Sequence, residues 1–180
     1  MNGSIKVQST YGKGSTFVVE LSQKIVESPA AEAEETRVEA DKNRKLMLKD
    51  INLLGVDDNG INLKVLRKIL ERYGLKIDVA PTGKDAIAKC MNKKYDLVLM
   101  DQMMPEMDGT EAMTKIRELG GGYEAGGNLK IVALTANAIS GVREELMNLG
   151  FDEYLTKPID VEELERLFIK LLTEDQYYYE

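Results

Sequence analysis

The fold is decided by the stretch YDLVLM, residues 95–100, together with LKIVALT, residues 129–135. Both stretches are almost wholly apolar, which is typical of strands buried on both faces of a parallel sheet. Outward from them, three more strand candidates alternate with stretches of helical length: INLLGV at 51–56, LKIDVA at 75–80 and DEYLT at 152–156. Five such strand-and-helix units predict an α/β domain with a doubly wound parallel sheet.

Between the strands, apolar residues recur at intervals of three and four, which predicts one buried face for each helix. Thr82 is expected to cap the start of one helix, and Gly74 and Gly150 are expected to end two others. The residues expected to face the core are Leu63, Leu66, Leu70 and Tyr73; Ala86, Ile87, Cys90 and Met91; Ile139, Val142, Leu146 and Leu149; and Val161, Leu164, Leu167, Phe168 and Leu171.

The composition of the 180-residue chain excludes several classes of function. With 24 basic and 31 acidic residues the net charge is -7, which argues against non-specific binding of nucleic acid. Histidine is absent, so Ser-His-Asp triads, HExxH zinc sites and a phosphorylated histidine are all excluded.

The single cysteine, Cys90, is interpreted as a core residue in a reducing compartment. No apolar run approaches the roughly 20 residues of a membrane span. We therefore expect a cytoplasmic segment without membrane contact, even if its parent protein is anchored elsewhere.

The start of the chain predicts a β-hairpin at residues 1–22. IKVQST and TFVVEL alternate apolar with polar residues on either side of the turn-rich YGKGS, residues 11–15. An isolated two-stranded hairpin is marginally stable in water, so this one is expected to be the severed edge of a larger sheet. The residues expected to share one face are Ile5, Val7, Phe17, Val19 and Leu21.

The remaining boundaries follow from changes in composition. Residues 23–49 are rich in Ala and Glu and are expected to form a solvated acidic linker, partly helical. The α/β domain is expected at 50–174 and a tail at 175–180. The three tyrosines at 177–179 are interpreted as an exposed helix end or a cloning remnant rather than as a binding motif.

Polar side chains follow four of the five predicted strands. Asp57 and Asp58 follow the first strand, Asp101 the third and Lys157 the fifth, and Thr135 ends the fourth. Ligands of an open parallel sheet bind beyond the carboxyl ends of its strands. These five residues are therefore the candidate site.

The charges of this candidate site indicate its ligands. Three carboxylates within ~4 Å of one another repel by about 4 kcal/mol per pair at an effective dielectric of roughly 20, more than Lys157 alone compensates. Mg2+, with its preference for oxygen ligands and retained waters, suits these acids. A lysine opposite them indicates that an anion binds as well, and a phosphoryl group bridging carboxylate, metal and ammonium satisfies every charge.

The same residues resemble a known family, the receiver domains of two-component response regulators. The matching text is LLGVDDNGIN, LVLMDQMMPEMDG, IVALTAN and YLTKPI, in the family's order and at its spacing, within about residues 51–172. The resemblance implies the flavodoxin-like fold, with strand order 2-1-3-4-5 and helices on both faces. It also implies a function: a phosphoryl group passes from a phosphohistidine to an aspartate of this chain.

The resemblance implies a role for each acid. Asp101 would be the phosphoacceptor and also a metal ligand, Asp58 the direct metal ligand, and Asp57 the acid that holds metal-bound waters. Met103 would offer its backbone carbonyl to the metal, which would be Mg2+.

It also implies the groups that act on the phosphoryl group. Lys157 would bind the phosphoryl group, and the Thr135 hydroxyl would contact it. Thr135 and Tyr154 would form a switch that reports phosphorylation to the helix and strand that follow them. Pro158 would follow a cis peptide bond.

The opening segment GSIKVQSTYGKGSTFVVEL resembles the final strands of a histidine kinase ATP-binding domain. Together the two resemblances imply a fragment of a hybrid histidine kinase whose phosphorylated histidine lies outside this chain. The expected partners are the phosphohistidine domain of a histidine kinase, as donor, and a histidine phosphotransfer protein, as acceptor. Hydrolysis of the phosphoaspartate, by self-dephosphorylation, is the other expected outlet.

Three other interpretations fit part of the pattern. An EF-hand would need oxygen ligands where Ile61 and Met103 stand. A Mg2+-dependent aspartyl phosphatase shares the strand-end aspartate, but requires a second acid where this chain has Met103. A degenerate receiver, acting only as a docking module, would lack an acid or the lysine. The phosphatase and the docking module are kept as alternatives.

Two glycines depart from the family pattern. Gly55 stands where a larger apolar side chain usually packs, which is expected to weaken the first strand by about 0.5 to 1 kcal/mol relative to alanine. Gly60 replaces a side chain that often borders the metal site, and so bears on metal affinity.

Overall fold

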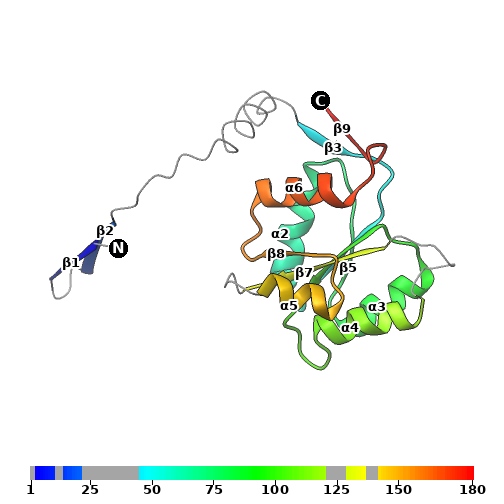
Figure 1. Cartoon of the computed structure of the whole chain (residues 1–180), viewed down its shortest axis with the longest axis horizontal. Helices are drawn as coiled ribbons and strands as arrows, with labels where there is room; N and C mark the ends of the chain where they lie inside the picture. Colours follow the sequence, from blue (N-terminus) through cyan, green and yellow to red (C-terminus); the bar gives the residue numbers. More distant parts are fainter. Residues whose placement is uncertain (1–2, 11–13, 22–44, 121–128, 137–141) are drawn as a thin grey trace. The chain divides into compact units, whose positions relative to one another are not determined.

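The computed structural model describes residues 3–10, 14–21, 45–120, 129–136 and 142–180 (Figure 1). The chain divides into two compact units, Met1–Asn43 and Arg44–Glu180. In the first unit, strand β1 (Gly3–Thr10) pairs antiparallel with β2 (Gly14–Leu21). Ile5 lies opposite Val19, and Val7 opposite Phe17, so the predicted hairpin is confirmed. Most of its expected turn and of the linker lies outside the described residues.

The second unit is built on a five-stranded parallel sheet. Along the chain its strands are β4 (Leu53–Val56), β5 (Asp78–Ala80), β6 (Leu97–Asp101), β7 (Lys130–Thr135) and β8 (Glu153–Thr156). Their order in the sheet is β5-β4-β6-β7-β8, and each neighbouring pair is parallel. This is the expected order 2-1-3-4-5, so the predicted flavodoxin-like fold is confirmed.

Five helices cover the two faces of this sheet in the described part of the chain. They are α2 (Gly60–Glu71), α3 (Gly83–Asn92), α4 (Gly109–Glu118), α5 (Val142–Leu149) and α6 (Val161–Leu171). Helices α2 and α6 lie on one face, and α3, α4 and α5 on the other (Figure 1). None of these described helices is long and apolar enough to cross a bilayer.

Successive residues of a strand pack in two separate hydrophobic cores, one on each face of the sheet. Leu97 and Leu99 join the cluster beneath α2 and α6, whereas Val98 and Met100 join the cluster beneath α3, α4 and α5. Every residue of β6 is buried. This two-sided burial explains why the sequence of the central strands is apolar without alternation.

The predicted helix ends are confirmed, but two expected core positions are wrong. Thr82 caps α3 through its side chain, and Gly74 and Gly150 have the positive φ angles that favour glycine. Met91 and Leu149 are 49% and 44% exposed. Met91 lies about 100° around the helix from the buried Cys90, and Leu149 is the last residue of α5. Ile139 lies outside the described residues.

The expected linker and tail meet in a small sheet. Strand β3 (Leu46–Leu48) pairs antiparallel with β9 (Tyr177–Tyr179). Leu46 and Leu48 are 2% and 5% exposed and pack in the α2 and α6 cluster, with Tyr177 against it. The compact unit thus begins at Arg44 and includes the tail. This unit extends beyond the expected limits of 50 and 174, because two short apolar segments pair and cover a face that neither could bury alone. The tail is a strand rather than the expected helix end, although Tyr178 and Tyr179 are exposed as expected.

Gly55 allows close packing of a helix on the sheet. A Cβ atom at this position would lie 2.6 Å from Cδ2 of Leu66, on α2. Gly55 is fully enclosed in β4, between β5 and β6. The departure from the family pattern therefore has a local reason, since the Leu66 side chain occupies the space that a larger residue would need.

Candidate functional site

Three carboxylates meet at the carboxyl ends of two neighbouring strands. Asp57 and Asp58 follow β4, and Asp101 is the last residue of β6, its neighbour in the sheet. One oxygen of each carboxylate lies within 4.8 Å of the others. Asp57 and Asp101 are only 1% and 5% exposed, whereas Asp58 is exposed. The three predicted acids are therefore brought together, with one open to solvent.

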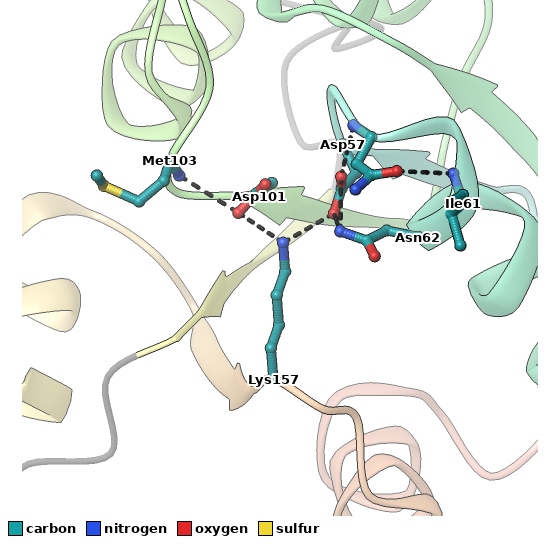
Figure 2. Close-up of polar contacts among 7 residues, drawn as sticks. Asp57, Ile61, Asn62, Asp101, Met103 and Lys157 are labelled. Atoms are coloured by element: carbon teal, nitrogen blue, oxygen red, sulfur yellow. Dashed lines mark hydrogen bonds and ion pairs between the residues drawn. The ribbon is translucent and has the colours of Figure 1, made fainter.

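Lys157 joins the two buried acids. It follows β8, and its Nζ atom lies 2.8 Å from Oδ2 of Asp57 and 2.8 Å from Oδ1 of Asp101 (Figure 2). Its backbone N–H donates to the carbonyl of Thr135 at 2.8 Å, and the peptide bond to Pro158 is cis, as the resemblance implies. The backbone thus fixes the base of the lysine, and the side chain reaches the acids across the sheet edge.

Burial and charge act in opposite directions on this cluster. Burial raises the pKa of Asp101 above its usual value, and the hydrogen bond and charge of Lys157 only partly oppose this effect. Burial alone would lower the pKa of Lys157, but its contacts with Asp101 and Asp57 outweigh burial and raise it. The lysine is therefore held as a cation beside a carboxylate that is more basic than usual.

The tight loop between β6 and α4 holds Asp101 in place. The backbone N–H of Met103 donates to Oδ1 of Asp101 at 3.3 Å, and that of Gly109 donates to the carbonyl of Gln102 at 3.0 Å. A Cβ atom on Gly109 would lie 2.3 Å from the Asp101 carbonyl oxygen. Only glycine fits there, because the start of α4 comes back against the end of β6.

The two residues of the expected switch lie on adjacent strands. Thr135 ends β7, is 2% exposed and lies beside Thr156 in register. Tyr154 lies beside Ala133 in the same pairing and is partly buried. Tyr154 also lines a surface hollow of about 280 Å3 between β8 and α6. Tyr154 is thus on the strand that Lys157 follows, and Thr135 is on the neighbouring strand.

Sequence reasoning missed one polar residue of the site. Asn62, in the first turn of α2, donates through Nδ2 to Oδ1 and Oδ2 of Asp57 at 3.0 and 3.1 Å (Figure 2). The backbone N–H of Asn59 also donates to Oδ1, at 2.9 Å. The signal was present in DDNGIN, where the second asparagine is one helical turn beyond the cap of α2.

The donor atoms of this site suit a hard divalent cation. Asp57, Asp58 and Asp101 supply only oxygen, and their spacing allows one ion to contact or share water with all three. The single positive charge of Lys157 does not neutralise the three formal negative charges. The residues present therefore fit Mg2+.

Comparison with known proteins identifies the fold's family. The model of the response regulator receiver domain matches residues 53–168, which include all three acids and Lys157. The chain belongs to the response regulator receiver family. It is 37% identical over 170 residues to the aerobic respiration control sensor protein ArcB of Escherichia coli, an alignment that covers 94% of this chain and 20% of ArcB. This receiver chain thus spans about a fifth of that relative.

Solved receiver structures share the fold. The receiver domain of the sensor histidine kinase PA1611 of Pseudomonas aeruginosa, which holds a magnesium ion in its active site cleft, is 32% identical, with a TM-score of 0.58. The match covers 68% of this chain and 98% of that one. The Saccharomyces cerevisiae Ssk1 receiver, in complex with the histidine phosphotransfer protein Ypd1, is 26% identical with a TM-score of 0.62 and covers 72% and 97%. Receivers of sensor histidine kinases are thus among the proteins to which this chain is similar.

Proposed function

We propose that this receiver accepts a phosphoryl group on Asp101 and is one station of a phosphorelay. The observation that carries this proposal is the position of Lys157, bound to Asp57 and Asp101 at once. A lysine between two buried acids, with a third acid open to solvent, forms a ready site for a group that is itself anionic. The docking-module alternative is not favoured, since the three acids and Lys157 are all present and lie together.

The reaction is a displacement at phosphorus. An oxygen of Asp101 attacks the phosphorus of a phosphohistidine on the donor, an O–P bond forms, the N–P bond breaks, and the imidazole nitrogen leaves with its electron pair. Lys157 neutralises charge on the phosphoryl oxygens. Transfer to the histidine of a phosphotransfer protein reverses these bonds, and attack by water releases inorganic phosphate instead.

The metal and the switch complete the proposal. Asp57, Asp58, Asp101 and the backbone carbonyl of Met103 would hold Mg2+, which, when bound, withdraws charge from the phosphoryl oxygens. The Thr135 hydroxyl would contact the phosphoryl group. Its movement, together with that of Tyr154, would change the surface formed by the following helix and strand.

The docking face that we propose for the partner is an apolar surface beside the site. Ile61 and Val65 on α2 are 69% and 53% exposed, and Val65 borders a hollow of about 300 Å3 that reaches Asp57 and Lys157. A phosphohistidine must come within bonding distance of Asp101, so its protein must cover the surface around this rim. We propose that a helix of the histidine phosphotransfer protein occupies this face.

The parent protein is proposed to be a hybrid histidine kinase in the cytoplasm or facing it. The alignment with ArcB covers 94% of this chain, so it includes part of the unit Met1–Asn43. This supports the proposal that the β1–β2 hairpin is the end of a kinase ATP-binding domain, joined to the receiver by a linker rich in alanine and glutamate. Limited proteolysis tests this arrangement, since rapid trimming before Arg44 is expected for a severed remnant and resistance would contradict it.

The central test uses a small phosphodonor. With Mg2+ and acetyl phosphate, intact mass should show one added phosphoryl group, and Asp101→Asn should abolish it. Asp96→Asn is the control, because Asp96 directly precedes the same strand at its opposite end, where it accepts from the backbone N–H of Asn52. Equal labelling of the Asp101→Asn variant would refute the assignment of the phosphoacceptor.

The docking face has a separate test. Val65→Glu should slow transfer from a phosphorylated histidine phosphotransfer protein by about 10-fold, as expected for loss of about 1.4 kcal/mol of binding. Labelling by acetyl phosphate should not change. Met91→Glu is the matched control, an equally exposed apolar residue on the opposite face of the sheet. Equal slowing by both variants would exclude α2 as the docking face.

A further inference from the structure

Asn62 holds both oxygens of Asp57. Its Nδ2 atom lies 3.0 Å from Oδ1 and 3.1 Å from Oδ2, and the Asp57 carboxylate is almost fully buried (Figure 2). Lys157 contacts Oδ2 at 2.8 Å, and the Asn59 N–H contacts Oδ1. The Asp57 carboxylate is therefore fixed from three directions.

The start of α2 places Asn62 for this contact. Asn59 caps the helix by accepting from the N–H of Ile61, and Asn62 lies in the first turn. Helical side chains lean toward the N-terminus of their helix, so the amide of Asn62 reaches back to the residue that ends β4.

Helix α2 differs from the other described helices in its first turn. Helices α3, α4, α5 and α6 each carry an acidic residue there, which suits the helix dipole, whereas α2 has none. An acid at position 62 would add a fourth carboxylate beside Asp57. An amide offers donors without adding negative charge.

We propose that Asn62 is a positioning residue that keeps Asp57 oriented toward metal-bound water when Lys157 moves to the phosphoryl group. The inference rests on the proposed function. Without a phosphoryl group, Lys157 is shared by Asp57 and Asp101. A phosphoryl group on Asp101 competes for the ammonium, so Asp57 loses its contact at Oδ2. The Asn62 amide, which carries no net charge, keeps its hold on both oxygens.

Metal affinity distinguishes positioning from simple helix capping. Calorimetric titration of the whole chain with Mg2+ should show about 10-fold weaker binding for Asn62→Leu, the lower end of what loss of a residue supporting a metal ligand produces. Asn92→Leu is the matched control, because Asn92 is an exposed helical asparagine whose Nδ2 donates to the Ala88 carbonyl of its own helix. Mg2+ affinity equal to that of the control would overturn the proposal.

A second pair of variants tests whether Asn62 acts through Asp57. In an Asp57→Asn background, adding Asn62→Leu should leave Mg2+ affinity unchanged within 2-fold, whereas independent roles would again give about 10-fold. The wild-type chain separates the two proposals. If it binds Mg2+ and is labelled on Asp101, a failure of the Asn62 variants counts against this inference alone. If it does not bind Mg2+, both proposals fail.

Discussion

Nζ of Lys157 and Oδ2 of Asp57 lie 2.8 Å apart, although 100 positions separate the two residues in the sequence. Strand β8, which precedes the lysine, is an edge strand, and two strands, β7 and β6, lie between it and β4. The contact therefore depends on the register of the four strands β4, β6, β7 and β8. Through this contact Lys157 contributes to the stability of the fold as well as to the chemistry of the site.

Lys157→Met should lower the free energy of unfolding by about 3 kcal/mol at pH 7 without divalent cation, because two buried acids are left without their cation. Millimolar Mg2+ should restore much of the loss. Urea unfolding with and without Mg2+ measures both effects. Lys93→Met, which breaks an exposed pair with Asp78, is the control and should cost less than about 1 kcal/mol. Similar losses in both variants would show that the site lysine is not structurally important.

Two glycines at equivalent positions should respond oppositely to alanine. Gly109 and Gly60 are the first residues of α4 and α2. A Cβ atom at Gly109 would meet the Asp101 backbone at 2.3 Å, whereas none of the described atoms lies within 4 Å of one at Gly60. Gly109→Ala should cost about 1 to 3 kcal/mol and slow labelling of Asp101. Gly60→Ala should stabilise by about 0.5 to 1 kcal/mol. Thermal unfolding that ranked the variants the other way would contradict the close approach at Gly109.

Glu153 should contribute stability that depends on pH. Burial alone would raise its pKa, but Lys170 and Arg143 outweigh burial and lower the pKa below its usual value. The stabilisation is therefore complete above the unfolded-state pKa of about 4.3 and is lost as the pH falls through the lower native value.

Glu153→Gln should accordingly be less stable than wild type by about 1 to 2 kcal/mol at pH 7. The difference should close as the solution becomes more acidic than the native-state pKa of Glu153. Urea unfolding over a pH series measures it. Glu118→Gln, at an exposed position on α4, should differ from wild type by less than about 0.5 kcal/mol throughout. A constant difference for Glu153→Gln would show that charge is not the cause.

Removal of residues 175–180 should expose the β3 segment. The N–H groups of Lys45 and Lys49 donate to carbonyls of Glu180 and Gln176, whereas that of Leu48 donates to Tyr73. Amide hydrogen exchange at Lys45 and Lys49 should rise at least about 10-fold, the equivalent of about 1.4 kcal/mol of lost local protection. Leu48 should change less. Tyr178→Ser, an exposed position on β9, leaves the backbone pairing intact and is the control. Unchanged exchange would contradict the β3–β9 sheet.

The sequence alone predicts the parts of this protein that depend on local pattern. Apolar runs predict the five parallel strands, and spacing of three and four predicts the faces of Leu66 on α2 and Leu164 on α6. The acids are predicted together because the carboxyl ends of parallel strands share one edge. The prediction that Asp57, Asp101 and Lys157 lie at one site required only the position of each residue relative to its strand.

Features that depend on contacts between distant segments could not be predicted in this way. Residues 46–48 and 177–179 are each too short to form a stable strand alone, so neither stretch indicates that it finds the other. Gly55 resembled a defect until the Leu66 side chain was placed beside it. Asn62 resembled an ordinary surface residue of α2, because its partner is defined only by the angle at which the helix leaves the strand.

The β3–β9 sheet also determines how the receiver responds to a mechanical force. Lys45 and Glu180 bond each other through both backbone groups, so these two residues lie side by side at the same end of the β3–β9 sheet. A force applied between these two residues breaks the hydrogen bonds of the β3–β9 sheet one after another. The force reaches the five-stranded sheet only after β3 and β9 have separated.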